Sequence, residues 1–566
     1  MIRTGLFSIL LLSRLVCAAQ DGATPTYSVH GTVVNAQTNQ PTARAEVILN
    51  QDYAVLTGSE GRFAFDQIPA GEYQVSVGRP GYISIGNFMG GNFGRGIRHP
   101  LQPQQIRVGP NMPELTFRLA PSASIRGQLS LSSSDSADGI RITVLQRQVW
   151  NGRPRWEPAG FAATDSDGIF HVGDLAPGRY MLFTEGSLDR PGLAAGRDAA
   201  TWGYPPVYYP GVTDAASAGV LTLGAGQTAE ADFTLTRQAF YTLIAQVRGG
   251  DSGIRAGFQI LDAGGRFTNM PARYDPREEV VRASVPNGSW ILQGQRFGPG
   301  PSRQEHAVGR TAFQVANGPV HIAIAVVPIP LLQMTIRREF TAKAEAQSQP
   351  AIMGIRGVGG PQVNFQLDNA EPFAQGGMIS APQFDPNADP SAETTTGTVD
   401  AMPGRYWVEA NSWNETYVSS VSSGGVDLAT NPLTISPDSS NAPIEVVLRN
   451  DVGTINVQIN GQASGESGAD AGSSVGEVPH IYIYAIPLYA TASSNIQPNL
   501  GANGQFRIPN LPPGSYRVVA CDSDQELEFH TAEGLAAWAG KGQVVTVEPG
   551  GTASVQVDVL HMEPQP

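Results

Sequence analysis

The chain has 566 residues, too many for a single hydrophobic core, so several domains are expected. Its hydrophobic fraction of 41% is that of a folded protein, and 65 glycines with 43 prolines favour many short strands and turns. The formal net charge of -14 argues against nucleic acid as a partner, because phosphate recognition needs a basic surface.

Residues 1–19 have the pattern of a secretion signal. Arg3 supplies a positive start, residues 5–12 form an apolar run, and small residues end at Ala19, where cleavage is expected. The alternative is an uncleaved membrane anchor, but the apolar run is too short for a bilayer that requires about 20 residues. Cleavage leaves Cys521 as the only cysteine, so no intrachain disulfide can form. A soluble protein of the periplasm or cell exterior, without a membrane span, is predicted.

A repeated pattern occurs at residues 61–73, 168–180 and 504–516. In each copy two glycines lie ten residues apart, and a tyrosine follows two residues after the second glycine. Between the glycines, an aromatic residue and a second apolar residue alternate, as in a strand with one buried face. The first glycine permits a positive-φ turn, and the second follows a tight turn that usually contains proline. The pattern predicts two strands joined by a corner.

Two shorter copies, at residues 285–290 and 402–406, extend the repeat along the whole chain. The corner recurs about every 110 residues, which is the length of one domain. Short alternating strands at this spacing predict an all-β protein, a tandem array of about five Ig-like or transthyretin-like β-sandwich domains. The third and fourth domains are divergent, and the second carries an aromatic insert. The expected boundaries are 20–120, 121–238, 239–330, 331–450 and 451–566.

Residues 27–82 resemble the carboxypeptidase regulatory-like domain. The resemblance rests on Gly31-Thr-Val33, Pro41, Ala45-Glu-Val47, Gly61-Arg-Phe63, Pro69-Ala-Gly71 and Gly81-Tyr82. It implies a seven-stranded transthyretin-like sandwich, a type grouped with carbohydrate-binding-like folds. The family resemblance brings no catalytic residues, and a fold alone does not define a function.

No catalytic residue is predicted. A Gly-x-Ser-x-Gly string surrounds Ser474, but it lies in a glycine- and serine-rich stretch at 461–477, where a nucleophile elbow would need a strand and a helix. The eight histidines show no close metal-ligand spacing. The sequence therefore favours a protein that is not an enzyme.

Calcium is the only cofactor for which the sequence offers candidate ligands. Asp165 and Asp167 resemble the start of a calcium loop, but the distal glutamate of an EF-hand is missing and they occupy a turn that any polar pair can fill, so turn chemistry is favoured. A denser group of carboxylates follows a strand in the fifth domain, and a solvated loop is the alternative interpretation there. These residues are Asp522, Asp524, Glu526 and Glu528.

Aromatic residues of the second domain are the candidate ligand-binding residues. They occur around an Asn-Gly turn signal at 150–156 and in a proline-containing stretch at 202–211, which is expected to be a loop. Such rings can stack on sugars or anchor a partner protein, or they can pack under the insert at 186–211. The candidates are Trp150, Trp156, Trp202, Tyr204, Tyr208 and Tyr209.

These observations favour a secreted, non-catalytic protein that binds a polysaccharide or another component of the cell envelope. A purely structural scaffold, or an array for protein–protein adhesion, is the alternative hypothesis. An accessory chain of an extracellular hydrolase is the third. The sequence does not indicate an oligomeric state.

Overall fold

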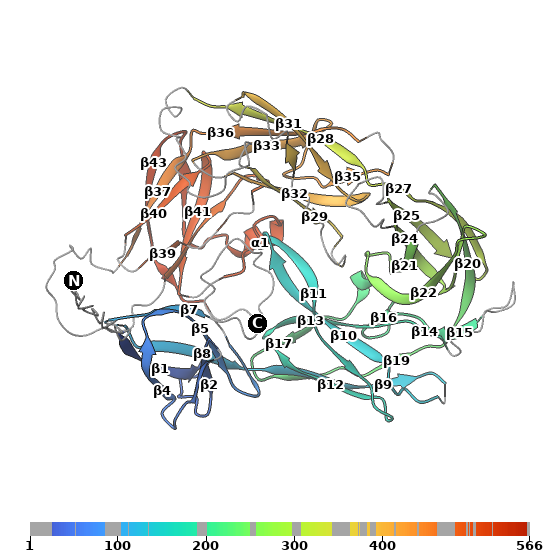
Figure 1. Ribbon diagram of the computed structural model, residues 1–566, viewed down its shortest axis with the longest axis horizontal. Coiled ribbons are helices and arrows are strands. Elements are labelled where there is room, and N and C mark those ends of the chain that lie inside the picture. The colour runs from blue at the N-terminus through green and yellow to red at the C-terminus, as the bar shows by residue number, and fades with distance from the viewer. Residues whose placement is uncertain are drawn as a thin grey trace, which may run out of the picture. The chain divides into compact units, whose positions relative to one another are not determined.

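The computed structural model confirms the all-β prediction (Figure 1). It describes residues 25–84, 104–188, 201–249, 256–296, 307–341, 363–460, 481–522 and 525–562, except for residues 51, 111, 134, 372, 374–381, 385–391, 413–414, 438–440, 494–495, 497–498 and 502–504. Among these residues α1 (Ala532–Ala537) is the one α-helix. The predicted secretion signal and Ser474 lie outside the described residues.

The strands form five successive groups, here named sandwiches 1 to 5: residues 25–120, 121–236, 237–329, 330–450 and 451–562. They divide into two compact units, of which unit 1 is sandwich 1 and unit 2 contains sandwiches 2 to 5. The expected domain boundaries stay a prediction, because the compact units separate only at the end of sandwich 1. The independence of the five domains stays a prediction, because sandwiches 2 to 5 form one compact unit.

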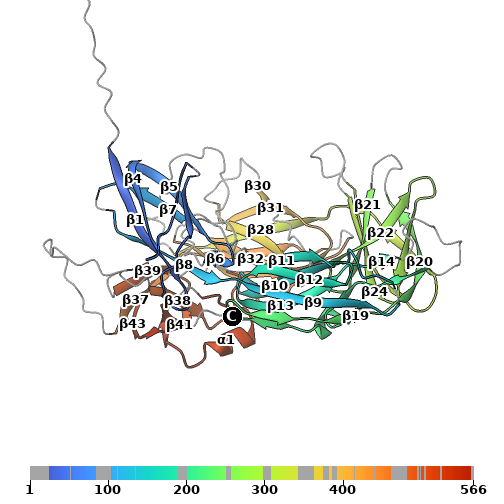
Figure 2. The same cartoon turned by 90° about the horizontal axis from the view of Figure 1, so that it is seen from below.

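Sandwich 1 has two four-stranded sheets around a core of Val, Leu, Ile and Phe side chains (Figure 2). The first sheet has the order β4 (Arg62–Pro69), β1 (Thr26–Asn35), β8 (Leu115–Pro121), β6 (Tyr82–Ser84). The second has the order β3 (Tyr53–Leu56), β2 (Glu46–Leu49), β5 (Gly71–Gly78), β7 (Gln104–Val108). Both β3 and β4 are therefore edge strands.

Sandwich 2 has the same plan with a much longer hairpin. One sheet has the order β12 (Ile169–Leu175), β9 (Ala123–Leu131), β18 (Thr228–Glu230), with β19 (Phe233–Leu235) also on β9. The other has the order β11 (Arg153–Ala163), β10 (Arg141–Trp150), β13 (Gly178–Thr184), β16 (Val207–Tyr208), with β17 (Leu221–Leu223) on β13. A 3-10 turn, η1, covers Ala215–Ser217.

Sandwich 3 differs because its strands belong to one continuous sheet, which also takes in two strands of the sandwich 2 insert. The order is β14 (Ser187–Leu188), β15 (Thr201–Tyr204), β20 (Gln238–Arg248), β23 (Val280–Pro286), β22 (Phe267–Asp275), β21 (Ala256–Asp262), β24 (Gly288–Arg296), β25 (Ala307–Val315), β27 (Val327–Pro328), with β26 (Val320–Ala325) on β20. The loop expected at 202–211 thus contains strands β15 and β16, since backbone partners are available on β20 and β13.

Sandwiches 4 and 5 again have two sheets each. Those of sandwich 4 are β30 (Gln383–Phe384), β31 (Thr394–Asp400), β28 (Leu331–Glu339), β36 (Ile444–Arg449), β33 (Tyr417–Ser423), β34 (Val426–Asp427), and β29 (Val363–Asn369), β32 (Gly404–Ser412), β35 (Leu433–Ile435). Those of sandwich 5 are β40 (Gln505–Leu511), β37 (Gly453–Ile459), β43 (Thr552–Val557), and β39 (Asn499–Gly501), β38 (Ile481–Pro487), β41 (Gly514–Cys521), β42 (Gln543–Val547), with β44 (Val559–Leu560) on β41.

The repeated pattern forms the strand–corner–strand unit that the sequence predicts. The first glycine has a positive φ in both described copies, +68° at Gly61 and +76° at Gly168. The tyrosine after the second glycine donates a hydrogen bond to the carbonyl oxygen four residues earlier, for example from Tyr73 to Pro69 at 3.0 Å. Tyr180, Trp290 and Tyr516 make the same bond to Ala176, Pro286 and Pro512. The corner therefore selects an aromatic residue with a polar donor at its tip.

Candidate functional site

The β10–β11 hairpin of sandwich 2 joins three sandwiches of unit 2 through partly buried ion pairs. Arg147 Nη2 on β10 lies 2.9 Å from Glu528 Oε2 of sandwich 5. Arg155 Nη2 on β11 lies 2.8 Å from Asp368 Oδ1 of sandwich 4, and their side chains are only 12% and 9% exposed. Such pairs hold charges that would be costly to leave without a partner. We name this contact region the hairpin hub.

The tip of the hairpin is an Asn-Gly turn, as the sequence predicts. Asn151 and Gly152 have φ values of 49° and +74°, so both adopt the positive φ of a type I′ hairpin turn. The Asn151 amide donates to the Glu409 carboxylate of sandwich 4. The Gly152 carbonyl accepts from His530 N at 3.1 Å, and a Cβ at Gly152 would lie 2.6 Å from the Phe529 ring. The turn thus fits closely against sandwich 5.

Arg153 occupies the middle of the hairpin hub. Its guanidinium carbon lies 3.7 Å from the centroid of the Trp407 ring, and Nη1 donates to the His530 carbonyl at 3.4 Å. Burial lowers the pKa of Arg153 to about 10, and Glu409 and Asp368 oppose that shift. Burial, with the charge of Arg153, lowers the pKa of His530 to about 3. At neutral pH the hub therefore holds a neutral imidazole beside a cationic arginine.

Sandwiches 2 and 3 meet at a second buried polar contact. The Tyr208 hydroxyl donates to Asp262 Oδ2 at 2.6 Å, and Arg266 lies over the Phe183 ring at 4.0 Å. Burial raises the pKa of Asp262 and lowers that of Arg266. The ring of Phe373, from sandwich 4, lies 5.8 Å from that of Tyr208. The contact therefore involves three sandwiches.

Two further contacts complete a closed series within unit 2. Arg310 of sandwich 3 forms an ion pair of 2.6 Å with Glu371 of sandwich 4. Ala410 N of sandwich 4 donates to the Ala492 carbonyl of sandwich 5 at 3.0 Å. Together with the hairpin hub, these contacts link sandwich 2 to 3, 3 to 4, 4 to 5, and 5 back to 2. The β10–β11 hairpin reaches α1 of sandwich 5 in Figure 1.

The six candidate aromatic residues do not share one surface. Tyr204 and Tyr208 are buried, 6% and 1% exposed, and Trp150, Trp156 and Tyr209 are partly buried. Trp156 packs on the cluster around Tyr208, and Tyr209 contacts the core of sandwich 2. Trp202 is 48% exposed, with Arg237 over its ring at 5.2 Å. A ligand-binding role for these residues stays a prediction, and Trp202 alone among them has a largely exposed ring.

Two of the four candidate calcium ligands, Asp522 and Glu528, contact basic side chains. Asp522 Oδ2 lies 2.7 Å from His561 Nδ1, and Glu528 pairs with Arg147. Glu526 is partly buried, and Asp524 lies outside the described residues. In the described part of the chain, no three His, Cys, Asp or Glu side chains gather as a metal site would require.

The turn interpretation of Asp165 is confirmed. Its Oδ1 accepts hydrogen bonds from the backbone N–H groups of Asp167 at 3.0 Å and Ile169 at 2.8 Å. This carboxylate therefore holds its own turn together. No metal ion is needed to explain the two acidic residues.

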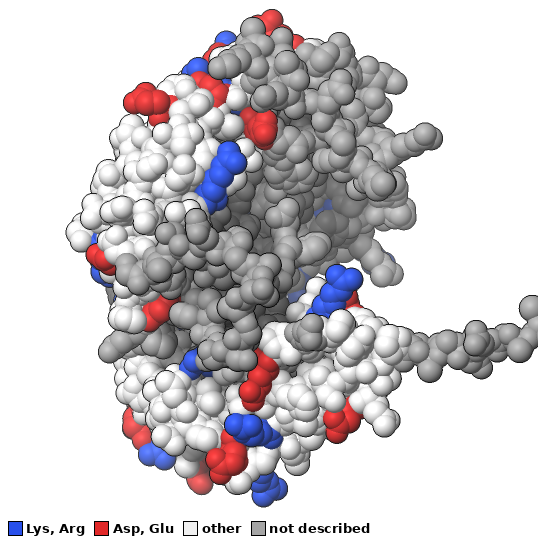
Figure 3. Space-filling model, turned by 90° about the vertical axis from the view of Figure 1, so that its left-hand side faces the viewer, with Lys and Arg blue, Asp and Glu red and all other residues white. Residues whose placement is uncertain are grey.

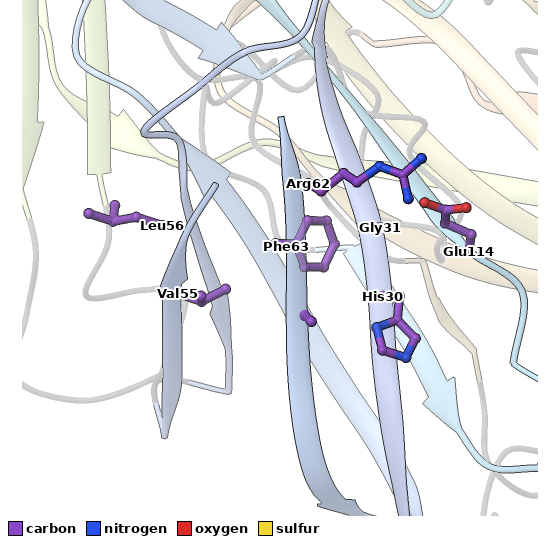
Figure 4. Close-up of a pocket in the computed structure, with 8 residues that line it drawn as sticks. His30, Gly31, Val55, Leu56, Arg62, Phe63 and Glu114 are labelled. Carbon is purple, nitrogen blue, oxygen red and sulfur yellow. The ribbon is translucent and has the colours of Figure 1, made fainter. Parts of the chain in front are cut away.

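Sandwich 1 contains an open pocket of about 640 Å³ (Figure 4). The pocket lies at the edge formed by β3 and β4. Its side chains offer one guanidinium, one carboxylate and one imidazole beside an apolar wall. The lining residues are His30, Gly31, Val55, Leu56, Arg62, Phe63, Ala64 and Glu114.

Sequence reasoning missed the hub and the pocket. Arg153 and Arg155 stood inside the aromatic motif at 150–156, but nothing in that motif identified Asp368 as a partner more than 200 residues away.

On the face shown in Figure 3, acidic and basic side chains are interspersed, and no single-sign patch gathers among its described residues. Within the described ranges, no helix has the length and apolar character needed to cross a bilayer.

Three solved structures that match parts of the chain are the TIE protein of Bacillus anthracis (10% identity, 75% of this chain and 68% of that chain, TM-score 0.14), the minor pilin GBS52 of Streptococcus agalactiae (11%, 37% and 96%, 0.19) and the shaft pilin SpaA of Lactobacillus rhamnosus GG (10%, 37% and 98%, 0.13). At these TM-scores the matches support no inference about fold or function. No curated protein sequence matches the chain. The carboxypeptidase regulatory-like family matches residues 28–87, so this part of sandwich 1 is a carboxypeptidase regulatory-like domain.

Proposed function

We propose that the protein is a non-catalytic scaffold of the periplasm or cell exterior, in which sandwiches 2 to 5 form one rigid body. The hairpin hub is the observation that carries this proposal. It connects sandwich 2 to sandwich 5 across 381 residues of sequence, through Arg147 and Glu528. The extracytoplasmic location rests on the secretion pattern of residues 1–19.

The chemistry of the contacts supports rigidity. Independent domains joined by linkers bury few polar groups between them, and such domains are expected to move relative to one another. Here Arg155 and Asp368 are both almost buried, and moving the sandwiches apart would break the ion pair between them. A buried charge without its partner is unfavourable, so the pair resists such motion. The closed series of contacts also means that no sandwich of unit 2 is held by a single neighbour.

Limited proteolysis of the full chain followed by size-exclusion chromatography tests the proposal. Fragments of unit 2 should elute together as one particle, because the hub and the other contacts persist after the loops are cut. An Arg147→Ala, Arg155→Ala variant should release them. A control variant, Arg126→Ala, removes an exposed pair with Glu230 and should change nothing. Separate elution of single-sandwich fragments from the unmodified protein would refute the rigid body.

A second candidate function is polymer binding, which the exposure of Trp202 favours. Trp202 is 48% exposed with Arg237 over its ring, and an exposed indole can stack on a sugar ring. Pull-down with a panel of insoluble polysaccharides tests this function, with Trp202→Ala as the loss variant. Phe161→Ala is the matched control, because Phe161 is 66% exposed and also lies beside an arginine, Arg141. Polysaccharide binding that Trp202→Ala retains, or an absence of binding by the wild-type protein, would exclude a role for Trp202.

A further inference from the structure

The free edge of β4 in sandwich 1 carries backbone groups that are available to a partner. β4 pairs with β1 on one side and is the last strand of its sheet among the described residues. Edge strands expose a row of unpaired N–H and C=O groups, which other chains can pair with. The register of β4 on β1 determines which residues of β4 present those groups.

Antiparallel pairs alternate between hydrogen-bonded and non-hydrogen-bonded positions. Val33 N donates to the Gly61 carbonyl at 2.8 Å, so this pair is hydrogen-bonded. The pair Gly31 and Phe63, two residues further along each strand, is then also hydrogen-bonded. Arg62 and Ala64 lie at the alternate positions, so their N–H and C=O groups point away from β1. The Arg62 carbonyl already accepts from Gly58 N at 3.0 Å, so the groups left for a partner are the Arg62 N–H and the N–H and C=O groups of Ala64.

Sandwich 2 shows how such an edge can be closed. At the equivalent turn, Asp165 N donates to the Ile169 carbonyl at 2.9 Å, and the Asp165 carboxylate accepts from Ile169 N. In sandwich 1 the residue at this position is Gly58, whose N–H donates to the Arg62 carbonyl at 3.0 Å. Glycine has no carboxylate, so the N–H of Arg62 lacks the side-chain acceptor that Asp165 gives to Ile169 N.

The pocket of sandwich 1 lies over this open stretch. Three consecutive residues of β4, Arg62 to Ala64, line it, as expected for a pocket that follows a strand edge. Val55 and Leu56 of β3 form an apolar wall, and Leu56 is 57% exposed. Figure 4 shows the Arg62 guanidinium above Gly31, on the side of Glu114.

We propose that this edge binds an extended peptide of a partner protein as an added strand on β4. Successive side chains of a strand point to opposite faces. A peptide residue opposite Phe63 would face Leu56 and Val55, so an apolar side chain fits there. Its neighbour opposite Ala64 would lie diagonally from Arg62 on the same face, so an acidic side chain fits there beside the guanidinium. Backbone pairing supplies affinity and these two positions supply selectivity.

Fluorescence polarisation with the full chain tests the proposal. The probe is a labelled hexapeptide, Ser-Glu-Val-Thr-Val-Ser, which alternates as the pocket requires. Saturable binding is expected, and a version of the peptide with alternate backbone nitrogens methylated should bind at least tenfold more weakly. Equal binding of both peptides would overturn strand addition, as would no saturable binding of the first.

The variant Gly58→Asp identifies the edge. Gly58 has an ordinary φ, and a Cβ there has no neighbour closer than 4.0 Å, so aspartate can cap Arg62 N as Asp165 caps Ile169. Affinity should fall at least tenfold while the melting temperature is kept. Gly109→Asp adds the same charge to sandwich 1 where a Cβ has open space, and it should leave the affinity unchanged. An equal loss in both variants, or no loss in either, would contradict the assignment.

Ala64→Pro gives a second check on the same edge. It removes an N–H that β1 does not use, and proline is tolerated on an edge strand when its nitrogen faces solvent. Far-UV circular dichroism would verify the fold. Retained affinity in a folded Ala64→Pro variant would overturn the proposal, and a tenfold loss would support it.

Discussion

Sandwiches 1 and 2 are built on the same repeat but use its turns differently. Both bury a threonine four residues before the first glycine of the repeat, Thr57 and Thr164, whose hydroxyl accepts from a backbone N–H and donates to a backbone carbonyl. Both place a glycine under the phenylalanine ring that comes two residues after the first glycine of the repeat. At Gly31 an added Cβ would lie 2.4 Å from Phe63, and at Gly127 it would lie 3.0 Å from the equivalent phenylalanine. These shared residues satisfy the backbone and the packing of the corner itself.

The differences lie where each sandwich meets other molecules or other sandwiches. The β2–β3 hairpin of sandwich 1 is short, whereas the β10–β11 hairpin continues far enough to bring arginines to sandwiches 4 and 5. Both turns donate a backbone N–H to the edge strand, but Asp165 also caps Ile169 N with its carboxylate, whereas Gly58 offers no side-chain acceptor to Arg62 N. The comparison teaches that the corner fixes the fold, while hairpin length and a single turn residue determine the contacts.

The largest effect is expected for Arg155→Met, in the part of the hairpin that sandwich 1 lacks. The substitution leaves Asp368 buried without its cation, which should lower the free energy of unfolding of unit 2 by about 3–5 kcal/mol. Urea denaturation followed by tryptophan fluorescence measures this change.

Two further variants sharpen that result. Arg155→Met combined with Asp368→Leu removes both charges and should recover much of the loss, since no unpaired charge remains. Arg126→Met, at an exposed ion pair of sandwich 2, should change the stability by at most about 1 kcal/mol. A loss for Arg155→Met as small as that for Arg126→Met would mean that the hub does not hold unit 2 together.

The next effect concerns pH and tests His530 beneath the hairpin tip. Its pKa is about 3 in the folded protein and near its ordinary value of 6.5 in the unfolded chain, so the unfolded chain binds the proton more tightly. The contribution of His530 to stability is therefore complete above pH 6.5 and is lost as the pH falls towards 3. The loss should approach about 1.4 kcal/mol per pH unit within that window.

The difference between the wild-type protein and His530→Gln isolates this contribution from that of Asp368. Burial raises the pKa of Asp368, so that residue favours the folded state as the pH falls, and its effect cancels in the difference. His171→Gln, at an exposed position on β12, is the control and should leave the pH dependence unchanged. Parallel curves for the wild type and His530→Gln would show that His530 is not shielded by the hub.

The smallest effect is expected for the shared corner. Tyr73→Phe and Tyr180→Phe each remove one hydroxyl that donates to a carbonyl oxygen four residues earlier. Each should lower stability by about 0.5–1.5 kcal/mol, the net contribution of a hydrogen bond. Thermal unfolding measures both variants. A loss confined to one of them would show that the corner is not equivalent in the two sandwiches.

The candidate sites depended on packing more than on pattern. Tyr208 stood in a proline-containing stretch that predicted a loop, yet it lies on strand β16 and is 1% exposed, with Asp262 of sandwich 3 as its partner. Glu528 stood among four carboxylates that were candidate calcium ligands, and it pairs with Arg147 of sandwich 2. In both cases the deciding partner lies on another sandwich, and no local pattern could identify it.

The sequence by itself determined the all-β class, the strand–corner–strand units, the Asn-Gly hairpin turn and the family of residues 28–87. These depend on φ preferences, side-chain alternation and turn chemistry, which act between residues close together in the chain. Only the tertiary structure decided that sandwiches 2 to 5 interlock and that the edge of β4 is open at Ala64. The physical reason is that ion pairs and burial depend on distances in space, which residues hundreds of positions apart do not encode in any local spacing.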